Sequence, residues 1–165
     1  MRHLFLYMIF FSLSVSTAFA VTVQDVKQLV EARDKKALAN AETLAKTEPK
    51  NAEAWILLTR ARLQSGKTES AIKAGETAAA LAPKNAQTHY WLGNAYGTRI
   101  GQVGMMSKMS LAPKLRDAFE ATIKLDPNNI EARSALVEYY LQAPGFMGGS
   151  KDKALVQASE IAKRD

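Results

Sequence analysis

The stretch Pro49-Lys50-Asn51-Ala52 recurs 34 residues later as Pro83-Lys84-Asn85-Ala86, and a third version, Pro127-Asn128-Asn129-Ile130, begins 44 residues after Pro83. Proline cannot donate to the hydrogen bonds of a helix, and its ring collides with the preceding turn. Each stretch is therefore expected to end one helix. The asparagine two residues after the proline can accept a hydrogen bond from the free N–H groups of the next helix. The sequence thus predicts helices separated by three equivalent junctions.

Between the first two junctions, apolar and small residues at three- and four-residue intervals predict two helices joined by a turn at Gly66. The first helix has this spacing at Ala54, Trp55, Leu58, Ala61 and Arg62. The second has it at Ala71, Ala74, Ala78 and Leu81. The chain contains 27 alanines, a composition that favours closely packed helices over sheets. We therefore predict an all-α fold.

This pattern resembles the tetratricopeptide repeat (TPR) family. In the best copy, residues of the family's signature are found at Trp55, Leu58, Ala71, Ala78 and Pro83. Further copies have them at Leu92, Gly93 and Tyr96, and then at Leu136, Tyr140 and Ala154. Thr59, Gly75 and Arg62 depart from the usual glycine, aromatic residue and tyrosine. The resemblance implies a TPR-type α-solenoid, a right-handed superhelix of antiparallel helix pairs.

Four units are expected after the first twenty residues. Their approximate ranges are 22–49, 50–83, 84–127 and 128–165, and together they make one domain over residues 21–165. Two insertions interrupt them, at 97–111 and 143–150. Self-similarity at such a period is typical of repeat architectures.

The first insertion is predicted to be a loop that carries Met105, Met106 and Met109, after which Ser110 caps a helix with Pro113 in its first turn. Methionine is flexible, so these side chains either line an adaptable partner surface or pack back onto their own helices. The second insertion contains Phe146 and Met147. The run from Pro144 to Lys153, together with the earlier junction Leu125-Asp126-Pro127, resembles a loop of a subgroup of exported bacterial TPR proteins.

Residues 1–20 are predicted to be a secretory signal peptide. Arg2 precedes an apolar run from Leu4 to Val15, and the segment ends in Ala18-Phe19-Ala20, the small residues that signal peptidase admits. We expect cleavage after Ala20 and a periplasmic protein, with full secretion as the alternative. No later segment is apolar enough to span a membrane.

The composition narrows the range of functions. The net charge of +6 in 165 residues is low for a dedicated nucleic-acid binder, so no nucleic-acid partner is expected. The sequence contains no cysteine, which excludes disulfides, thiolate metal sites and thiol catalysis.

The resemblance implies that the first helix of each pair lines a concave groove that binds a protein or peptide. Carried over residue by residue, the partner-binding candidates are Ile56, Arg60, Leu63, Tyr90, Asn94, Glu131 and Glu138. These residues combine aromatic, amide, basic and acidic groups, which suits a peptide of mixed charge. The arrangement of lysine and asparagine with which some TPR domains bind a terminal carboxylate is not present. The partner itself is not identified by the sequence.

A second hypothesis is a small-anion or glycan-binding protein of the cell envelope. Gly149, Ser150 and Lys151 could present backbone N–H groups and a cation to an anion, and the Tyr90/Trp91 region could hold a glycan. The spacing of these residues is not that of a phosphate-binding P-loop. The competing interpretation is structural, with glycines that turn the chain and Ser150 as the cap of the last helix.

No enzyme, cofactor or metal site is predicted. His89 is the only histidine after Ala20, and it occupies a repeat position that usually holds a packing residue. Without a second histidine, no arrangement resembling a catalytic triad is visible. Met106, Met109 and His89 are too few and too irregularly spaced for a closed copper site.

Overall fold

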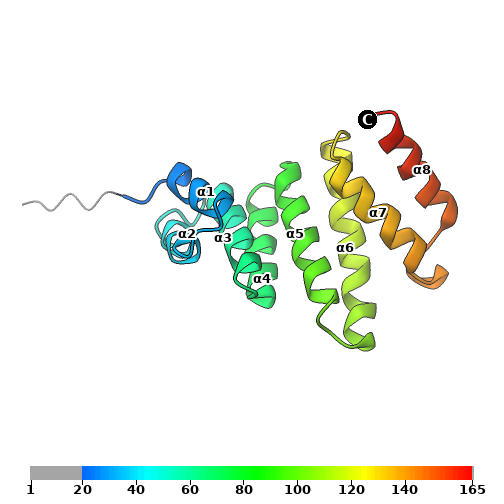
Figure 1. The fold of residues 1–165 in the computed structure, drawn as a ribbon, viewed down its shortest axis with the longest axis horizontal. Helices are drawn as coiled ribbons and strands as arrows, with labels where there is room; N and C mark the ends of the chain where they lie inside the picture. The colour runs from blue at the N-terminus through cyan, green and yellow to red at the C-terminus, as the bar shows by residue number, and fades with distance from the viewer. Residues whose placement is uncertain (1–19, 165) are drawn as a thin grey trace, which may run out of the picture.

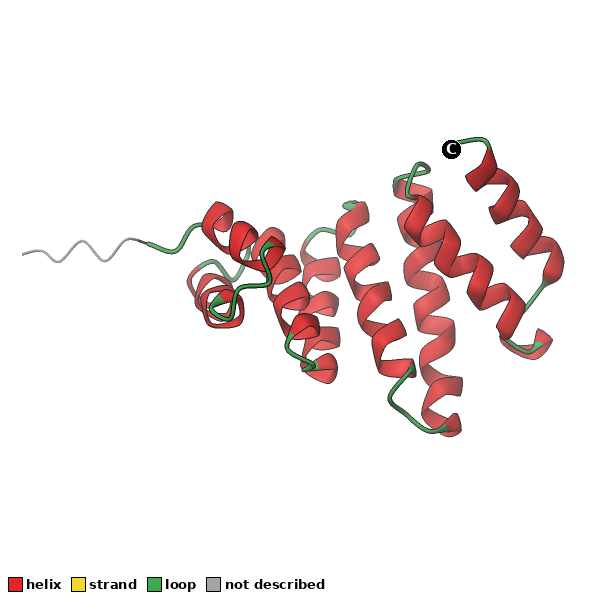
Figure 2. Ribbon diagram, in the orientation of Figure 1, coloured by secondary structure: helices red, strands yellow, loops and turns green. Residues whose placement is uncertain are grey.

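A computed structural model describes residues 20–164, which contain eight α-helices and one short 3-10 helix. The helices are α1 (Val23–Glu31), α2 (Ala37–Thr47), α3 (Ala52–Gln64), α4 (Thr68–Leu81), α5 (Ala86–Ile100), α6 (Met105–Leu125), α7 (Ile130–Gln142), η1 (Gly145–Met147) and α8 (Lys151–Ala162). The predicted all-α fold is confirmed, and the helices follow one another along an elongated molecule (Figures 1 and 2). Nearly all of the predicted signal peptide lies outside the described residues.

Helix pairs are the structural unit. Each helix from α1 to α8 packs against the next one along the chain, and α3 also packs against both α1 and α5. Alanines at the contacts, among them Ala41, Ala61, Ala74 and Ala78, are at most 1% exposed. Because these side chains are small, neighbouring helices approach closely and each pair supplies part of the core of the next.

The three junctions predicted from the sequence cap helices as expected. The Asn51 side chain accepts a hydrogen bond from the Glu53 N–H at 3.0 Å, and Asn85 accepts one from Gln87 at the same distance. Asn129 accepts from the Ala132 N–H at 2.8 Å. Each cap satisfies one of the N–H groups that a helix leaves free at its start.

A second contact recurs at the same junctions. Trp55 Nε1 donates to the Pro49 carbonyl, six residues earlier, at 2.9 Å. His89 Nε2 makes the same bond to the Pro83 carbonyl, also six residues earlier and at 2.9 Å. Arg133 Nε makes the corresponding bond to Pro127 at 3.0 Å. Three different side chains thus tie the start of a helix back to the preceding turn. His89 has the same structural role as Trp55 and Arg133.

A third recurring contact joins each pair to the previous one. The Tyr96 hydroxyl donates to Glu76 at 2.9 Å, and the Tyr140 hydroxyl donates to Glu120 at 2.5 Å. Arg62 and Glu42 form the corresponding contact as an ion pair at 3.8 Å. The arginine at position 62, a departure from the family signature, therefore keeps the inter-repeat contact with a different chemistry.

The first insertion is largely helical, so the predicted loop over 97–111 is wrong. It lengthens α5 to Ile100 and starts α6 at Met105, leaving only residues 101–104 between the two helices. Ser110 is not a helix cap, because it lies inside α6 and its hydroxyl donates to the Ser107 carbonyl at 2.9 Å. Gly104 occupies the N-cap position, and Pro113 lies inside the helix rather than in its first turn.

Candidate functional site

The predicted concave face comes from α3, α5 and α7, the first helices of three successive pairs. Ile56 does not belong to its accessible surface, because only 2% of it is exposed and a partner could not reach the side chain. Leu63 is half-buried on α3, as are Tyr90 and Asn94 on α5, while Glu131 and Glu138 are exposed on α7. Six of the seven predicted partner-binding residues are therefore accessible.

The centre of this face is a row of side chains in contact with one another. The Arg60 guanidinium lies 4.7 Å from the centre of the Trp91 ring, a cation–π contact that joins α3 to α5. Trp91 meets Tyr90 edge to face at 5.3 Å between ring centres, and Tyr90 in turn lies 6.2 Å from Phe119. Arg60 Nε is buried without a hydrogen-bond partner in the described structure. The Arg60–Trp91 contact is not predictable from the repeat pattern, because the two residues belong to different repeats.

Asn94 and Glu138 face a common cavity. The Asn94 amide donates to the Tyr90 carbonyl at 2.8 Å, one turn back on α5, and this bond fixes its orientation. Glu138 accepts from the Gln142 side chain at 3.0 Å, one turn further along α7. Both residues line a cavity of about 610 Å³. This volume is within the range of ligand-binding clefts in proteins.

The cavity forms where α5 and α7 separate. Earlier in the solenoid α1 packs on α3 and α3 on α5, whereas α5 and α7 do not pack on each other in this way. The floor between them comes from α6 through Ala112, Leu115 and Phe119. Figure 1 shows α6 behind the space between α5 and α7. α6 thus provides an apolar floor at the place where the earlier first helices contact each other.

Both insertions contribute to this cavity. Met105, Lys108 and Met109 line it from the first turns of α6, and Pro144, Phe146 and Met147 line it from the segment around η1. From the sequence, the methionines of the first insertion had two interpretations, a partner surface or packing on their own helices, and nothing linked the two insertions. The structure brings the insertions together, with Met105 and Met109 on the cavity and Met106 outside its lining.

The Gly-Gly-Ser segment is structural. A Cβ atom on Gly149 would fall 1.7 Å from the Ala143 carbonyl oxygen, and Gly148 has a φ of +93°. The Gly149 N–H donates to the Pro144 carbonyl at 3.1 Å, and the Ser150 N–H donates to the Tyr140 carbonyl at 2.9 Å. These two N–H groups are therefore not available to an anion, and the predicted anion site is wrong on this point.

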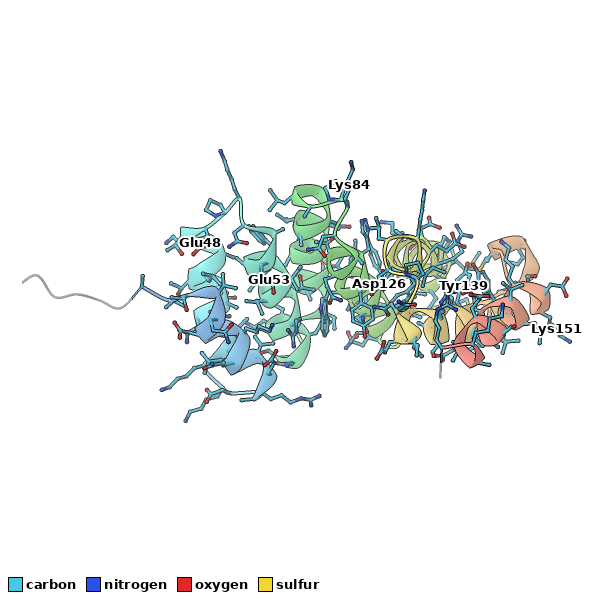
Figure 3. All side chains as sticks on the ribbon, turned by 90° about the horizontal axis from the view of Figure 1, so that it is seen from above. Glu48, Glu53, Lys84, Asp126, Tyr139 and Lys151 are labelled. Atoms are coloured by element: carbon cyan, nitrogen blue, oxygen red, sulfur yellow. The ribbon has the colours of Figure 1, made fainter. Side chains whose placement is uncertain are left out.

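The other members of that segment fit the structural interpretation. Ser150 caps α8 by accepting from the Lys153 N–H at 3.3 Å. Lys151 is exposed at the start of α8 and is drawn at the end of the molecule in Figure 3. An isolated exposed lysine in water contributes little to the binding of an anion.

Ionisable groups with shifted pKa values belong to structural contacts. Burial raises the pKa of the Tyr96 hydroxyl, and its hydrogen bond to Glu76 raises it further. Burial and the bond to Glu120 do the same for Tyr140. Within residues 20–164, no cluster of three or more histidine, aspartate or glutamate side chains could hold a metal ion. No helix of that part of the chain is long and apolar enough to cross a membrane.

Comparisons with known proteins agree with this architecture. The family model of the TPR repeat matches residues 60–98. A crystal structure of MamA is similar with a TM-score of 0.66 at 22% identity, over 89% of this chain and 80% of that one. TTC0263, a thermophilic TPR protein of Thermus thermophilus, is similar with a TM-score of 0.63 at 21% identity, over 86% of this chain and 71% of that one.

A third structure, residues 41 to the end of MamA from Desulfovibrio magneticus RS-1, has a TM-score of 0.60 at 23% identity, over 86% of this chain and 71% of that one. At these identities the likeness shows the fold. No protein of curated function matches the sequence.

Proposed function

Because the chain is a protein of tetratricopeptide repeats, we propose that it is a non-catalytic scaffold that binds a protein or peptide along its concave face. Solenoids of stacked helix pairs bind partners on such extended concave surfaces. The residues assigned to this face are Arg60, Leu63, Tyr90, Asn94, Glu131 and Glu138.

The observation that carries the proposal is the shared cavity of Asn94 and Glu138. These two residues come from different repeats, and the sequence pattern predicts their groove position independently of the cavity. Next to them, Arg60, Trp91 and Tyr90 form a row of aromatic and cation–π contacts. Aromatic residues and arginine are enriched among the residues that dominate binding energy at protein interfaces.

The non-catalytic part of the proposal rests on the structural contacts of Tyr96, Tyr140 and His89. Burial raises the pKa values of Tyr96 and Tyr140, and the inter-repeat hydrogen bond that each makes to a glutamate raises them further. His89 is bound to a backbone carbonyl at a repeat junction. Neither arrangement places an acid and a base against a common reacting atom, as acid–base catalysis requires.

Residues 1–20 lead us to propose a periplasmic location, with full secretion as the alternative. An apolar run that ends in Ala18-Phe19-Ala20 has the form of an export signal. The resemblance of the run 144–153 to a loop of exported bacterial TPR proteins supports the same location. Fractionation of the native bacterium followed by mass spectrometry of the protein's N-terminus tests this proposal. An N-terminal Val21 in the periplasmic fraction is expected, and an intact Met1 in the cytoplasmic fraction would contradict it.

Selection of peptides from a random 12-residue display library tests the binding function. The purified protein should enrich related sequences, and the combined variant Tyr90→Ala, Asn94→Ala should lose them. A matched control is Lys46→Ala with Lys124→Ala, since both lysines are exposed on α2 and α6, the second helices of their pairs. Failure of the wild-type protein to enrich any sequence would contradict the proposed function.

A further inference from the structure

The cavity between α5 and α7 has an unusual lining for a surface in water. Met105 is 72% exposed, Met109 is 42% exposed and Phe146 is 80% exposed. All three line the cavity, and they come from the two insertions that distinguish this chain from a plain repeat array. Grouped exposed apolar side chains mark interaction sites in soluble proteins. Methionine side chains adapt their shape to whatever they contact.

Two charged side chains line the same cavity, one on each of two helices. Lys108 lies on the first turns of α6, and Glu138 lies on α7. Lys108 lies one turn from the start of α6, and Glu138 lies one turn from the end of α7. Among residues 20–164, neither side chain belongs to an ion pair.

We propose that this cavity binds an apolar segment of a protein partner that carries a basic residue against Glu138 and an acidic residue against Lys108. The inference rests on the proposed function and names the chemistry of the partner at one place on the concave face. The apolar residues of the segment lie on the floor of Ala112, Leu115 and Phe119, and Met109 and Phe146 close over them.

The form of the cavity suits a peptide segment. Its lining comes from α5, α6, α7 and the segment around η1, and the exposure of Met105, Met109 and Phe146 shows that it is open to solvent. A helical peptide fills such an open cavity with apolar side chains at three- and four-residue spacing. Asn94, Thr98 and Gln142 lie among the lining residues and can bond to polar groups of the segment.

The charge arrangement is tested with three fluorescent 14-residue probe peptides that share one apolar face. They carry lysine at both ends of that face, glutamate at both ends, or one of each. The wild-type protein should bind the mixed peptide about threefold more tightly than the other two, since exposed ion pairs contribute little each. Glu138→Lys should shift the preference to the glutamate peptide, and Lys108→Glu should shift it to the lysine peptide. The readout is fluorescence anisotropy.

The apolar contacts are tested with Met109→Gln and Phe146→Ser, both at exposed positions where folding is expected to survive. Each substitution should lower the affinity for the mixed peptide by about tenfold, the loss expected when one large apolar contact is removed. Met106→Gln is the matched control, since Met106 is 82% exposed on the same helix and does not line the cavity. It should leave the affinity unchanged. Circular dichroism confirms that each variant is folded.

The outcomes separate this inference from the proposed function. If the charge-reversed variants keep the wild-type preference, or if Met109→Gln and Met106→Gln behave alike, the inference is wrong. Absence of binding by all three probes would also overturn it. The display peptides give a further outcome. If they no longer bind the Tyr90→Ala, Asn94→Ala variant but still bind Phe146→Ser, the proposed function is supported and the inference is wrong.

Discussion

Gly93 on α5 faces the ring of Phe119 on α6 so closely that a Cβ atom at position 93 would lie 2.8 Å from the ring. Real side-chain contacts do not reach this distance, so only glycine permits the observed approach of the two helices. Phe119 is 4% exposed and forms part of the cavity floor. The packing of one repeat thus sets the position of the surface that we assign to a partner.

Gly93→Ala should therefore lower the free energy of unfolding by about 1–3 kcal/mol, the usual cost of overpacking a core. Chemical denaturation monitored by circular dichroism measures the change. Gly145→Ala is the control, because nothing lies within 4 Å of a Cβ atom there, and it should change stability by less than about 0.5 kcal/mol. Equal stability of the two variants would show that α5 and α6 do not meet as described.

The bond between His89 and the Pro83 carbonyl predicts which substitutions the histidine tolerates. His89→Leu removes the donor and should cost about 0.5–1.5 kcal/mol of stability. His89→Trp should recover part of that loss, since Trp55 makes the same bond to Pro49 at the equivalent junction. Thermal unfolding of the two variants makes the comparison. The structural role of His89 is disproved if leucine is tolerated as well as tryptophan.

The buried hydroxyls of Tyr96 and Tyr140 predict a late step in an alkaline titration. Burial and a glutamate acceptor raise both pKa values, so these groups favour the folded state while they stay protonated. Their contribution is complete below the ordinary tyrosine value of about 10 and is lost as the pH rises above it. Ultraviolet absorbance should show Tyr96 and Tyr140 ionising later than an ordinary tyrosine.

Tyr96→Phe and Tyr140→Phe identify the source of that late step, because each should reduce its amplitude. A single titration near the ordinary tyrosine pKa of about 10, in a protein that circular dichroism shows to be folded, would contradict the two hydrogen bonds.

At the other end of the pH range, Glu160 on α8 should remain ionised below the usual glutamate pKa of 4.5. Its hydrogen bonds to Lys163 and then Arg164 lower its pKa to about 2 from the usual 4.5. The stability that it contributes is present above pH 4.5 and is lost as the pH falls toward 2. Carbon-13 NMR of the side-chain carboxyl follows the titration. Lys163→Ala should raise the midpoint, whereas an unshifted midpoint in the wild-type protein would exclude these contacts.

The features that were predictable from the sequence are those that depend on nearby residues. Asn51, Asn85 and Asn129 cap helices because each one bonds within three residues of itself. Alanine spacing predicted which faces are buried, since a helical face is fixed by its period. Ser150 was expected to cap α8 on the same local grounds and does so.

The features that were missed depend on contacts between helices. Glycines over 97–111 suggested a loop, yet Gly97 lies on α5 against α6. A Cβ atom at this position would lie only 3.3 Å from the Leu115 side chain, so glycine allows the two helices to pack closely. Pro113 removes one N–H from the hydrogen bonds of α6 and crowds the preceding turn, and packing against α5 compensates for this cost. The cavity was equally invisible, because it requires two insertions about forty residues apart to meet.

Site-specific photo-cross-linking in living cells tests the central claim most directly. A photoreactive amino acid is placed at Asn94, Glu131 or Glu138 on the concave face, or at Lys46 or Lys124 on the second helices of their pairs. We expect the three concave positions to give the same protein adduct after irradiation and the two lysine positions to give none. Adducts formed equally from both sets of positions, or from the lysines alone, would contradict a scaffold that binds its partner along the concave face.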